Sequence, residues 1–348
     1  DGGVQVVQAF DVAHGGCALA PATQAAYFET AFLAAWRGEI ENDGLNKLVL
    51  GAGLSARQVT YLRALTKYLR QTGLPFSQPY IEGILIAQVE IARLLVTAFE
   101  TRFDPALSPD LRSGDWIRSN QALDHALDQV VSLDADRVLR AFVAVIRAAL
   151  RTNAWQKAAD GGTKDWLSIK LDPSKIPELP QPRPMFEIWV YSPEVEGVHL
   201  RGGRVARGGL RWSDRRQDFR TEVLGLMKAQ QVKNTVIVPV GAKGGFVVKK
   251  PVDASNREAW MAQGIACYKT FLRGLLDLTD NRVGNTIVPP TDTVRVDPDD
   301  AYLVVAADKG TATFSDYANG VSAEYGFWLG DAFASGGSAG YDHKKMGI

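Results

Sequence analysis

The chain has 348 residues, of which 46% are hydrophobic, enough for one large domain or two domains with real cores. Its 39 basic and 39 acidic residues cancel, so no overall field points to a nucleic-acid partner, and no apolar run approaches the ~20 residues that span a bilayer. The two cysteines lie far apart and the four histidines are scattered, which argues against a disulfide framework and a metal site and favours a reducing, cytoplasmic setting.

The first half of the chain carries helical patterns. A capping box of Ser55 and Gln58 opens a helix whose apolar residues recur at helical spacing until Gly73. Further helices are expected over 77–103 and 134–150. These patterns predict a helical N-terminal region.

Gly51, Gly53 and Ala56 have the G-x-G-x-x-A spacing of a dinucleotide-binding turn. Such a turn needs a strand before the glycines, a second strand after the following helix, and an acidic residue about 20 positions on. Here the helix after Ala56 leads into a loop at 73–77, and the first acidic residue, Glu82, falls in the next expected helix. The stretch is therefore interpreted as a turn that leads into a helix N-cap.

Five prolines fall between Pro173 and Pro184, a density that predicts an extended linker. This segment suggests a division into a helical region over 1–172, a linker over 173–184 and an α/β domain over 185–348. The last of these carries apolar strand patterns that alternate with helical ones. The expected elements are strands at 185–191, 197–200, 235–240 and 301–307, with helices at 217–233 and 257–278.

Two of the apolar runs are followed by a reactive residue among small ones: Lys243 after the run 235–240, and Asp308 after the run 301–307. Because ligands of α/β sheets bind beyond the carboxyl ends of strands, both side chains are expected to face one cleft. The glycines beside Lys243 would let backbone approach a ligand. The alternative is a surface lysine in a turn and an aspartate that caps a helix near Thr311.

The segment 201–250 contains twelve Lys and Arg residues against three acidic ones, which suggests an anionic ligand. Arg207, Arg211 and Lys233 lie near the glycines around Lys243 and would suit a small dianionic substrate. Two other readings remain open. The segment could be a scaffolding or oligomerisation surface, or a nucleic-acid-binding module, although it has little aromatic interleaving.

The stretch 199–247, "HLRGGRVARGGLRWSDRRQDFRTEVLGLMKAQQVKNTVIVPVGAKGGFV", resembles the large bacterial NAD-dependent glutamate dehydrogenases, and "VVAADKGTATFSDYAN" at 304–319 continues the resemblance. The likeness covers nearly the whole chain. It implies a segment with the substrate-binding α/β domain, built on a mixed sheet, of an enzyme that oxidises L-glutamate to 2-oxoglutarate and ammonia. The same resemblance implies a catabolic homotetramer, with NAD bound mainly by a Rossmann domain beyond Ile348, and an inactive isolated segment.

The resemblance also implies roles for individual residues. Lys243 is similar to the catalytic lysine and Asp308 to the catalytic acid-base. Burial and neighbouring cations would disfavour the ammonium form of Lys243, so that it could activate the attacking water, while Asp308 would move protons to and from the substrate nitrogen.

Four further residues are implied as substrate ligands. Gln230 and Lys233 match a Gln-x-x-Lys pair whose lysine holds the α-carboxylate. Arg207 stands where smaller glutamate dehydrogenases have the lysine that meets the γ-carboxylate, and Arg211 matches the arginine after the glycines. The replacement of lysine by arginine changes geometry as well as length, because a guanidinium can bind a carboxylate bidentately.

Overall fold

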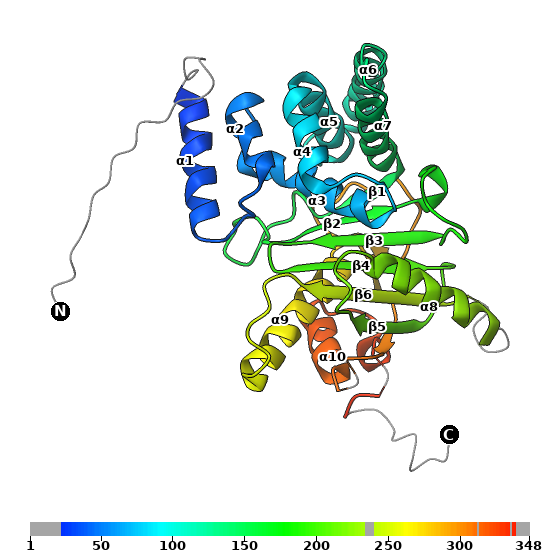
Figure 1. Ribbon diagram of the computed structural model, residues 1–348. Coiled ribbons are helices and arrows are strands. Elements are labelled where there is room, and N and C mark those ends of the chain that lie inside the picture. The colour runs from blue at the N-terminus through cyan, green and yellow to red at the C-terminus, as the bar shows by residue number, and fades with distance from the viewer. Residues whose placement is uncertain (1–21, 234–239, 312, 335, 339–348) are drawn as a thin grey trace.

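The structure is a computed structural model that describes residues 22–233, 240–311, 313–334 and 336–338 (Figure 1). Its described α-helices are α1 (Ala22–Trp36), α2 (Lys47–Gly51), α3 (Ala56–Gln71), α4 (Gln78–Ala87), α5 (Val89–Phe103), α6 (Pro109–Leu127), α7 (Leu133–Ala148), α8 (Phe219–Lys233), α9 (Arg257–Leu276) and α10 (Ser315–Glu324). The described strands are β1 (Ala149–Thr152), β2 (Leu167–Leu171), β3 (Phe186–Tyr191), β4 (Val195–Arg201), β5 (Gly208–Trp212), β6 (Ala242–Val248), β7 (Asn281–Val283), β8 (Thr286–Val288) and β9 (Val305–Ala307). Short 3-10 helices lie at Gly44–Asn46, Pro173–Lys175 and Gly330–Ala332.

Seven strands form one mixed sheet in the order β1-β2-β3-β4-β6-β5-β9, and β7 and β8 form a separate hairpin. The strands from β1 to β6 in this order pair antiparallel, whereas β5 runs parallel to both β6 and β9. This arrangement confirms the expected α/β fold with a mixed sheet. In Figure 1 the helices α1 to α7 gather above the sheet, with α9 and α10 below it.

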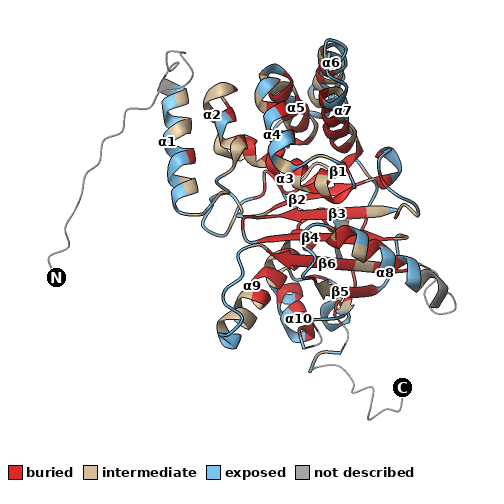
Figure 2. Ribbon diagram, in the orientation of Figure 1, coloured by how far each residue is buried: buried red, intermediate tan, exposed pale blue. Residues whose placement is uncertain are grey.

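Each face of the sheet is buried against helices, because successive side chains of a strand point to opposite sides. On β3, Trp189 and Tyr191 join the core that also contains residues of α2 to α8. Ile188 and Val190 join a second core with α9 and α10. Figure 2 accordingly shows the central strands as buried along most of their length.

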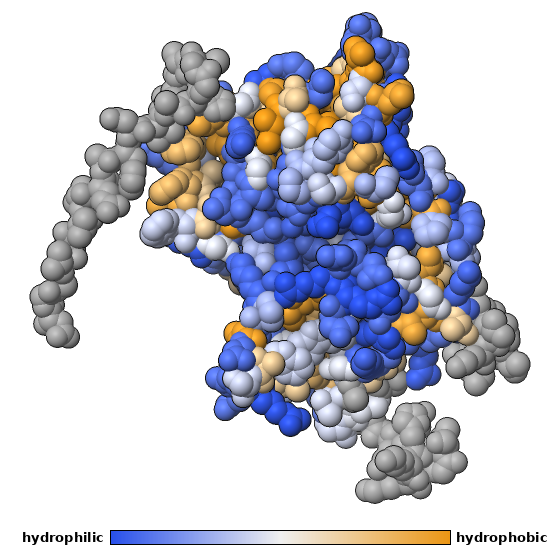
Figure 3. Space-filling view, viewed as in Figure 1, coloured by the Kyte–Doolittle hydropathy of each residue, from blue (hydrophilic) through white to orange (hydrophobic). Residues whose placement is uncertain are grey.

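The outer surface differs between the helical region and the middle of the molecule. The helix α1 leaves Phe32, Leu33 and Trp36 exposed, and hydrophobic residues gather along it in Figure 3, while hydrophilic residues cover the middle of this face around α8. None of the helices that the structure describes is both long and apolar enough to cross a membrane.

The helical predictions hold with two exceptions. The helix expected over 134–150 ends at Ala148, and Ala149 and Leu150 belong to β1. Ser55 caps α3, and the reciprocal contact from Gln58 completes the expected capping box. The helix expected over 77–103 is instead two helices, α4 and α5, separated at Gln88, whose φ of -110 and ψ of 56 are not helical. Apolar residues continue on both sides of Gln88, so hydrophobic periodicity carries no sign of this break.

The proline-rich segment 173–184 connects two neighbouring strands of one sheet. The strands β1 and β2 precede the segment, and β2 pairs directly with β3, which follows it. The predicted domain boundary is therefore not a boundary of the sheet. Proline favours extended, surface connections, and such connections join strands within a domain as readily as they join two domains.

Two strand predictions differ from the structure. The strand expected at 235–240 lies outside the described residues, and the strand described next to it, β6, begins at Ala242 and contains Lys243. The apolar run 301–307 is a strand only in its last three residues, β9. Asp308 follows β9 directly, as expected.

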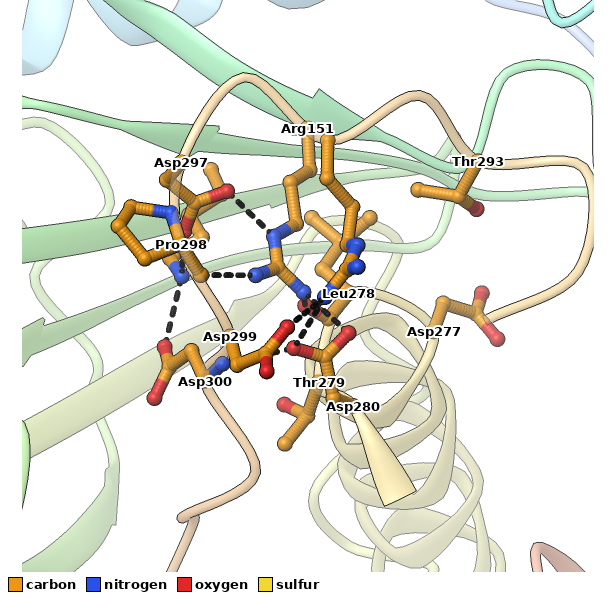
Figure 4. Close-up of polar contacts among 12 residues, drawn as sticks. Arg151, Asp277, Leu278, Thr279, Asp280, Thr293, Asp297, Pro298, Asp299 and Asp300 are labelled. Carbon is orange, nitrogen blue, oxygen red and sulfur yellow. Dashed lines mark hydrogen bonds and ion pairs between the residues drawn. The ribbon is translucent and has the colours of Figure 1, made fainter. Parts of the chain in front are cut away.

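Buried ion pairs hold the connection between α9 and β9 against the sheet (Figure 4). Arg151 of β1 donates to Asp280 and Asp297, with Nη1 to Oδ1 at 2.8 Å and Nε to Oδ1 at 2.6 Å, respectively. Lys170 of β2 donates to Asp297 and to Asp300, its Nζ lying 2.6 Å from Asp300 Oδ2. Both cationic side chains are fully buried. The first strands of the sheet thus fix the segment that leads to β9 and Asp308.

Candidate active site

The structure brings Lys243 and Asp308 together on the face of the sheet that α8 covers. Lys243 Nζ donates to Asp308 Oδ2 at 2.7 Å, and the two side chains are only 13% and 16% exposed. They come from β6 and from the turn after β9, with β5 between them. The closest described charge to Lys243 is thus a carboxylate, where the sequence suggested neighbouring cations.

A second cation reaches the same carboxylate from the intervening strand. Arg211 of β5 places Nη2 3.3 Å from Asp308 Oδ1, and its Nη1 donates to Glu222 Oε1 of α8 at 2.8 Å. Ser213, two residues further along the chain, donates to the other oxygen of Glu222 at 2.6 Å. The result is a row of alternating charges: Lys243, Asp308, Arg211 and Glu222.

The turn after β9 fixes the backbone of Asp308. The N–H of Asp308 donates to Thr311 Oγ1 at 3.0 Å, and the Thr311 hydroxyl donates to the carbonyl of Leu210 at 2.6 Å. The N–H of Lys309 donates to Asp308 Oδ1 at 2.7 Å. Because the carboxylate serves these contacts and α10 begins only at Ser315, Asp308 is not the cap of that helix.

These donors also set the charge of Asp308. Partial burial acts to raise the pKa of this carboxyl, but the hydrogen bond from Lys243, the N–H of Lys309 and the charge of Arg211 outweigh it and lower the pKa below its ordinary value. Asp308 is therefore an ionised carboxylate near neutral pH and can accept a proton.

The glycines near Lys243 serve packing between elements of this chain. A Cβ at Gly208 would lie 1.3 Å from the carbonyl oxygen of Ala242. A Cβ at Gly241 would lie 2.7 Å from Gln230 Oε1, and one at Gly245 would lie 2.6 Å from Val223. Their missing side chains let β5, β6 and α8 approach one another closely, where the sequence suggested room for a ligand.

The remaining predicted ligands lie around the start of β6. The backbone of Arg207 bridges to Gly241, and its side chain is exposed. Gln230 lies on α8, and its buried Oε1 has no hydrogen-bond partner among the described residues. Lys233 ends α8, but its side chain lies outside the described residues. The structure thus brings Arg207 and Gln230 to the strand that carries Lys243.

Cations of the basic segment 201–250 form ion pairs within the chain. Arg220 and Glu187 form a buried pair with Nη2 to Oε2 at 2.6 Å, Arg215 pairs with Asp218, and Lys249 pairs with Glu196 at 3.1 Å. These pairs neutralise part of the local excess of positive charge, which weakens the reading of this segment as a nucleic-acid-binding surface.

Sequence reasoning missed Glu222 and Ser213. Glu222 counted only as one of three acidic residues in a basic segment. Its position directly before Val223, beside the apolar face of the helix, is the signal that could have found it, because a largely buried carboxylate needs a partner. The helical spacing of the segment 217–233 places Phe219, Val223, Met227 and Gln230 on one face, and the structure buries the first three and half-buries Gln230.

Neither a metal site nor a dinucleotide turn is found in the part of the chain that the structure describes. No group of three or more His, Cys, Asp or Glu side chains there could hold a metal ion. The residues before Gly51 form the helix α2, so the G-x-G-x-x-A stretch lacks the strand that a Rossmann turn requires.

Two family models match the chain. The model described as "Bacterial NAD-glutamate dehydrogenase, catalytic domain" covers residues 122–348, and "Glutamate dehydrogenase, helical motif 3" covers residues 40–105. The first match begins before the proline-rich segment and continues through it, as the sheet does.

Relatives from three bacteria are named NAD-specific glutamate dehydrogenase. The chain is 58% identical to the proteins of Halomonas elongata, over 321 residues, and Pseudomonas aeruginosa, over 324 residues. It is 57% identical to the protein of Mycobacterium tuberculosis over 329 residues. Each match covers 92% of this chain but only 20% of the relative, so the chain spans about a fifth of the length of these relatives. The chain belongs to the bacterial NAD-glutamate dehydrogenase family.

Proposed function

We propose that this chain supplies the substrate site for the oxidative deamination of L-glutamate to 2-oxoglutarate and ammonia. The observation that carries the proposal is the partly buried pair of Lys243 and Asp308, 2.7 Å apart, within the region that matches the catalytic-domain model. The names of the relatives support the choice of reaction and of NAD as cofactor.

The pair suits the proton transfers of this reaction. NAD, when bound, supplies the acceptor for the hydride that leaves the substrate Cα. Asp308 takes a proton from the substrate ammonium group, and the resulting amine can become an iminium as the hydride departs. Asp308 passes this proton to solvent and then takes one from Lys243 Nζ along their hydrogen bond, which leaves Lys243 as a neutral amine. The amine acts as base and takes a proton from the water as the water adds to this carbon, and Asp308 moves a proton from the new hydroxyl group to the amino group as it leaves. Release of ammonia leaves the 2-oxo acid.

The two carboxylates of glutamate need cationic or hydrogen-bonding partners around this pair. We assign the γ-carboxylate to Arg207 and the α-carboxylate to Lys233, with Gln230 beside them, as the family resemblance implies. Arg207 and Gln230 both adjoin Gly241, one residue before β6, which supports a location next to Lys243.

The cofactor is assigned mainly to a nucleotide-binding domain outside this chain. The described residues do not fit a dinucleotide site at their one candidate turn, because α2 replaces the required strand before Gly51. A homotetramer, as the resemblance implies, and a cytoplasmic setting, as the cysteine usage suggests, belong to the same proposal.

The test is made in the full-length protein that carries this chain. Lys243→Met and Asp308→Asn should each lower kcat for glutamate by about 10²–10⁴-fold, because each removes a group that transfers protons. Lys250→Met is the matched control, since it removes an exposed lysine that pairs with Glu194 outside the site and should leave kcat unchanged. A wild-type protein that cannot oxidise glutamate with NAD would refute the function, and near-normal kcat in either variant would refute the assigned role.

A further inference from the structure

Glu222 of α8 lies in the site, and each of its two carboxylate oxygens accepts a hydrogen bond. Oε1 accepts from Arg211 Nη1 at 2.8 Å, and Oε2 accepts from Ser213 Oγ at 2.6 Å. Its side chain is 15% exposed and Arg211 is 18% exposed, so the pair is largely sheltered from water. An ion pair in such surroundings is screened less than a surface pair and holds a more defined geometry.

Arg211 has protein carboxylates at both ends of its guanidinium. Nη1 faces Glu222, and Nη2 lies 3.3 Å from Asp308 Oδ1. A guanidinium is planar and presents its donors in a fixed fork, so holding one end also fixes the direction of the other. With both terminal nitrogens engaged in this way, the contacts of Arg211 point to a role other than the substrate ligand that the family resemblance implied.

We propose that Glu222 is a positioning residue that, braced by Ser213, holds Arg211 against Asp308 and thereby sets the direction of the catalytic carboxylate. Oδ1 of Asp308 then accepts from Arg211 while Oδ2 faces Lys243. The hydrogen bonds of Glu222 go to Arg211 and Ser213, so Glu222 acts on the reaction through Arg211 alone. This inference rests on the proposed function and adds a supporting layer to its catalytic pair.

The charges around Asp308 predict how the variants differ in pH dependence. Lys243 faces the carboxylate from β6 and Arg211 from β5, Lys309 follows it in the turn, and Glu222 on α8 lies behind Arg211. Removal of Arg211 takes away a cation that favours ionised Asp308, so the acidic limb of kcat/KM should move to higher pH. Loss of a substrate ligand would raise KM and leave this limb in place.

The experiment is a double-mutant cycle in the full-length protein, with glutamate as the varied substrate. Glu222→Gln keeps the shape of the side chain and removes its charge, and it should lower kcat by roughly ten- to a hundredfold, the range expected for one charge-assisted hydrogen bond, with KM little changed. Arg211→Met should lower kcat at least as much and shift the acidic limb upward. The double variant should be no worse than Arg211→Met alone, because Glu222 then has nothing left to position.

The matched control is Asp218→Asn. Asp218 lies four residues before Glu222 and also pairs with an arginine, Arg215, but both side chains are 48% exposed, and kcat should stay unchanged. Arg211→Lys should fail to restore kcat, because a lysine lacks the fork that spans both carboxylates.

Three results would overturn the inference: unchanged kcat in Glu222→Gln, losses that add in the double variant, or a KM for glutamate that rises tenfold or more in Arg211→Met with an unshifted acidic limb. If Glu222→Gln does not fold, Ser213→Ala is tested in its place, because it removes only the hydrogen bond from Ser213 to Glu222. This variant should lower kcat by a smaller factor, and an unchanged kcat would refute the proposal. Failure of the wild type to oxidise glutamate would count against the proposed function and not against this positioning role.

Discussion

At the scale of single residues, His199 shows how burial determines the charge of a histidine side chain. It lies on β4, is 2% exposed, and its Nε2 has no hydrogen-bond partner among the described residues. Burial and the nearby charge of Arg201 lower the pKa of this imidazole to about 3. The scattered positions of the histidines in the sequence argued only against a metal site, and the structure shows that this histidine is packed in the interior.

This histidine predicts a loss of stability in mild acid. Its folded pKa, about 3, lies below the ~6.5 of an unfolded histidine, so the unfolded chain binds more protons between these values and stability falls as pH falls below ~6.5. One such proton contributes up to ~1.4 kcal/mol per pH unit. The measurement is Tm against pH for wild type and His199→Gln. The variant should lose less stability between pH 7.5 and 5.5, and the exposed His125→Gln should behave like wild type. Parallel curves for His199→Gln and wild type would contradict the expectation.

At the scale of elements, the sequence predicted the features that depend on residues within a single helix or strand. The capping box of Ser55 and the apolar face of α8 depend on neighbours three or four residues away, and both were found. The pairing of β2 with β3 across the proline-rich segment depends on residues far apart in the chain, and the boundary drawn at 173–184 missed it.

The same reasoning explains how much of the candidate site was predicted. Lys243 and Asp308 were recognisable because each lies beside an apolar run among small residues. Glu222 and Ser213 were not, because their contacts with each other and with Arg211 exist only when α8 packs on the sheet. The packing role of the glycines was also missed for this reason: a Cβ at Gly241 or Gly245 would meet side chains of α8, a different element of the chain.

The buried ion pairs between β2 and the connection to β9 predict a large effect of one substitution. Lys170→Met leaves the carboxylates of Asp297 and Asp300 buried with one partner fewer, and breaking a buried pair from one side costs about 3–5 kcal/mol. Lys175→Met is the matched control, because its pair with Asp172 spans 3.5 Å at a side chain that is 55% exposed. Thermal and urea unfolding of the full-length variants should show a clear loss of stability only for Lys170→Met. Equal stabilities would mean that the network adds little to the fold.

At the scale of the whole molecule, the candidate catalytic residues and the stabilising ion pairs lie on opposite faces of the sheet. The face under α8 carries the pair of Lys243 and Asp308, and the opposite face carries the core of α9 and α10 and the ion pairs around Arg151. Both meet at β9, because the connection fixed by Arg151 and Lys170 leads into this strand, which Asp308 follows directly. The helical region packs on the α8 face of the sheet through α3. It also contains the turn from Gly51 to Ser55, whose glycine spacing resembles that of a dinucleotide-binding motif.

That turn gives the last prediction. Gly53 has a φ of 64, a left-handed conformation that joins α2 to the capped start of α3, so its glycine is explained by the connection between two helices. Replacing it in the full-length protein should therefore change stability and leave KM for NAD unchanged. Gly53→Ala should lower Tm because alanine is strained at positive φ, and Gly53→Asn should lower it less because asparagine tolerates this conformation. A rise in KM for NAD of about tenfold or more, equal to 1.4 kcal/mol of binding, in both variants would instead place a dinucleotide contact in the helical region. Steady-state kinetics with varied NAD, alongside Tm, separates the two outcomes, because a loss of folding lowers the amount of active enzyme without changing KM.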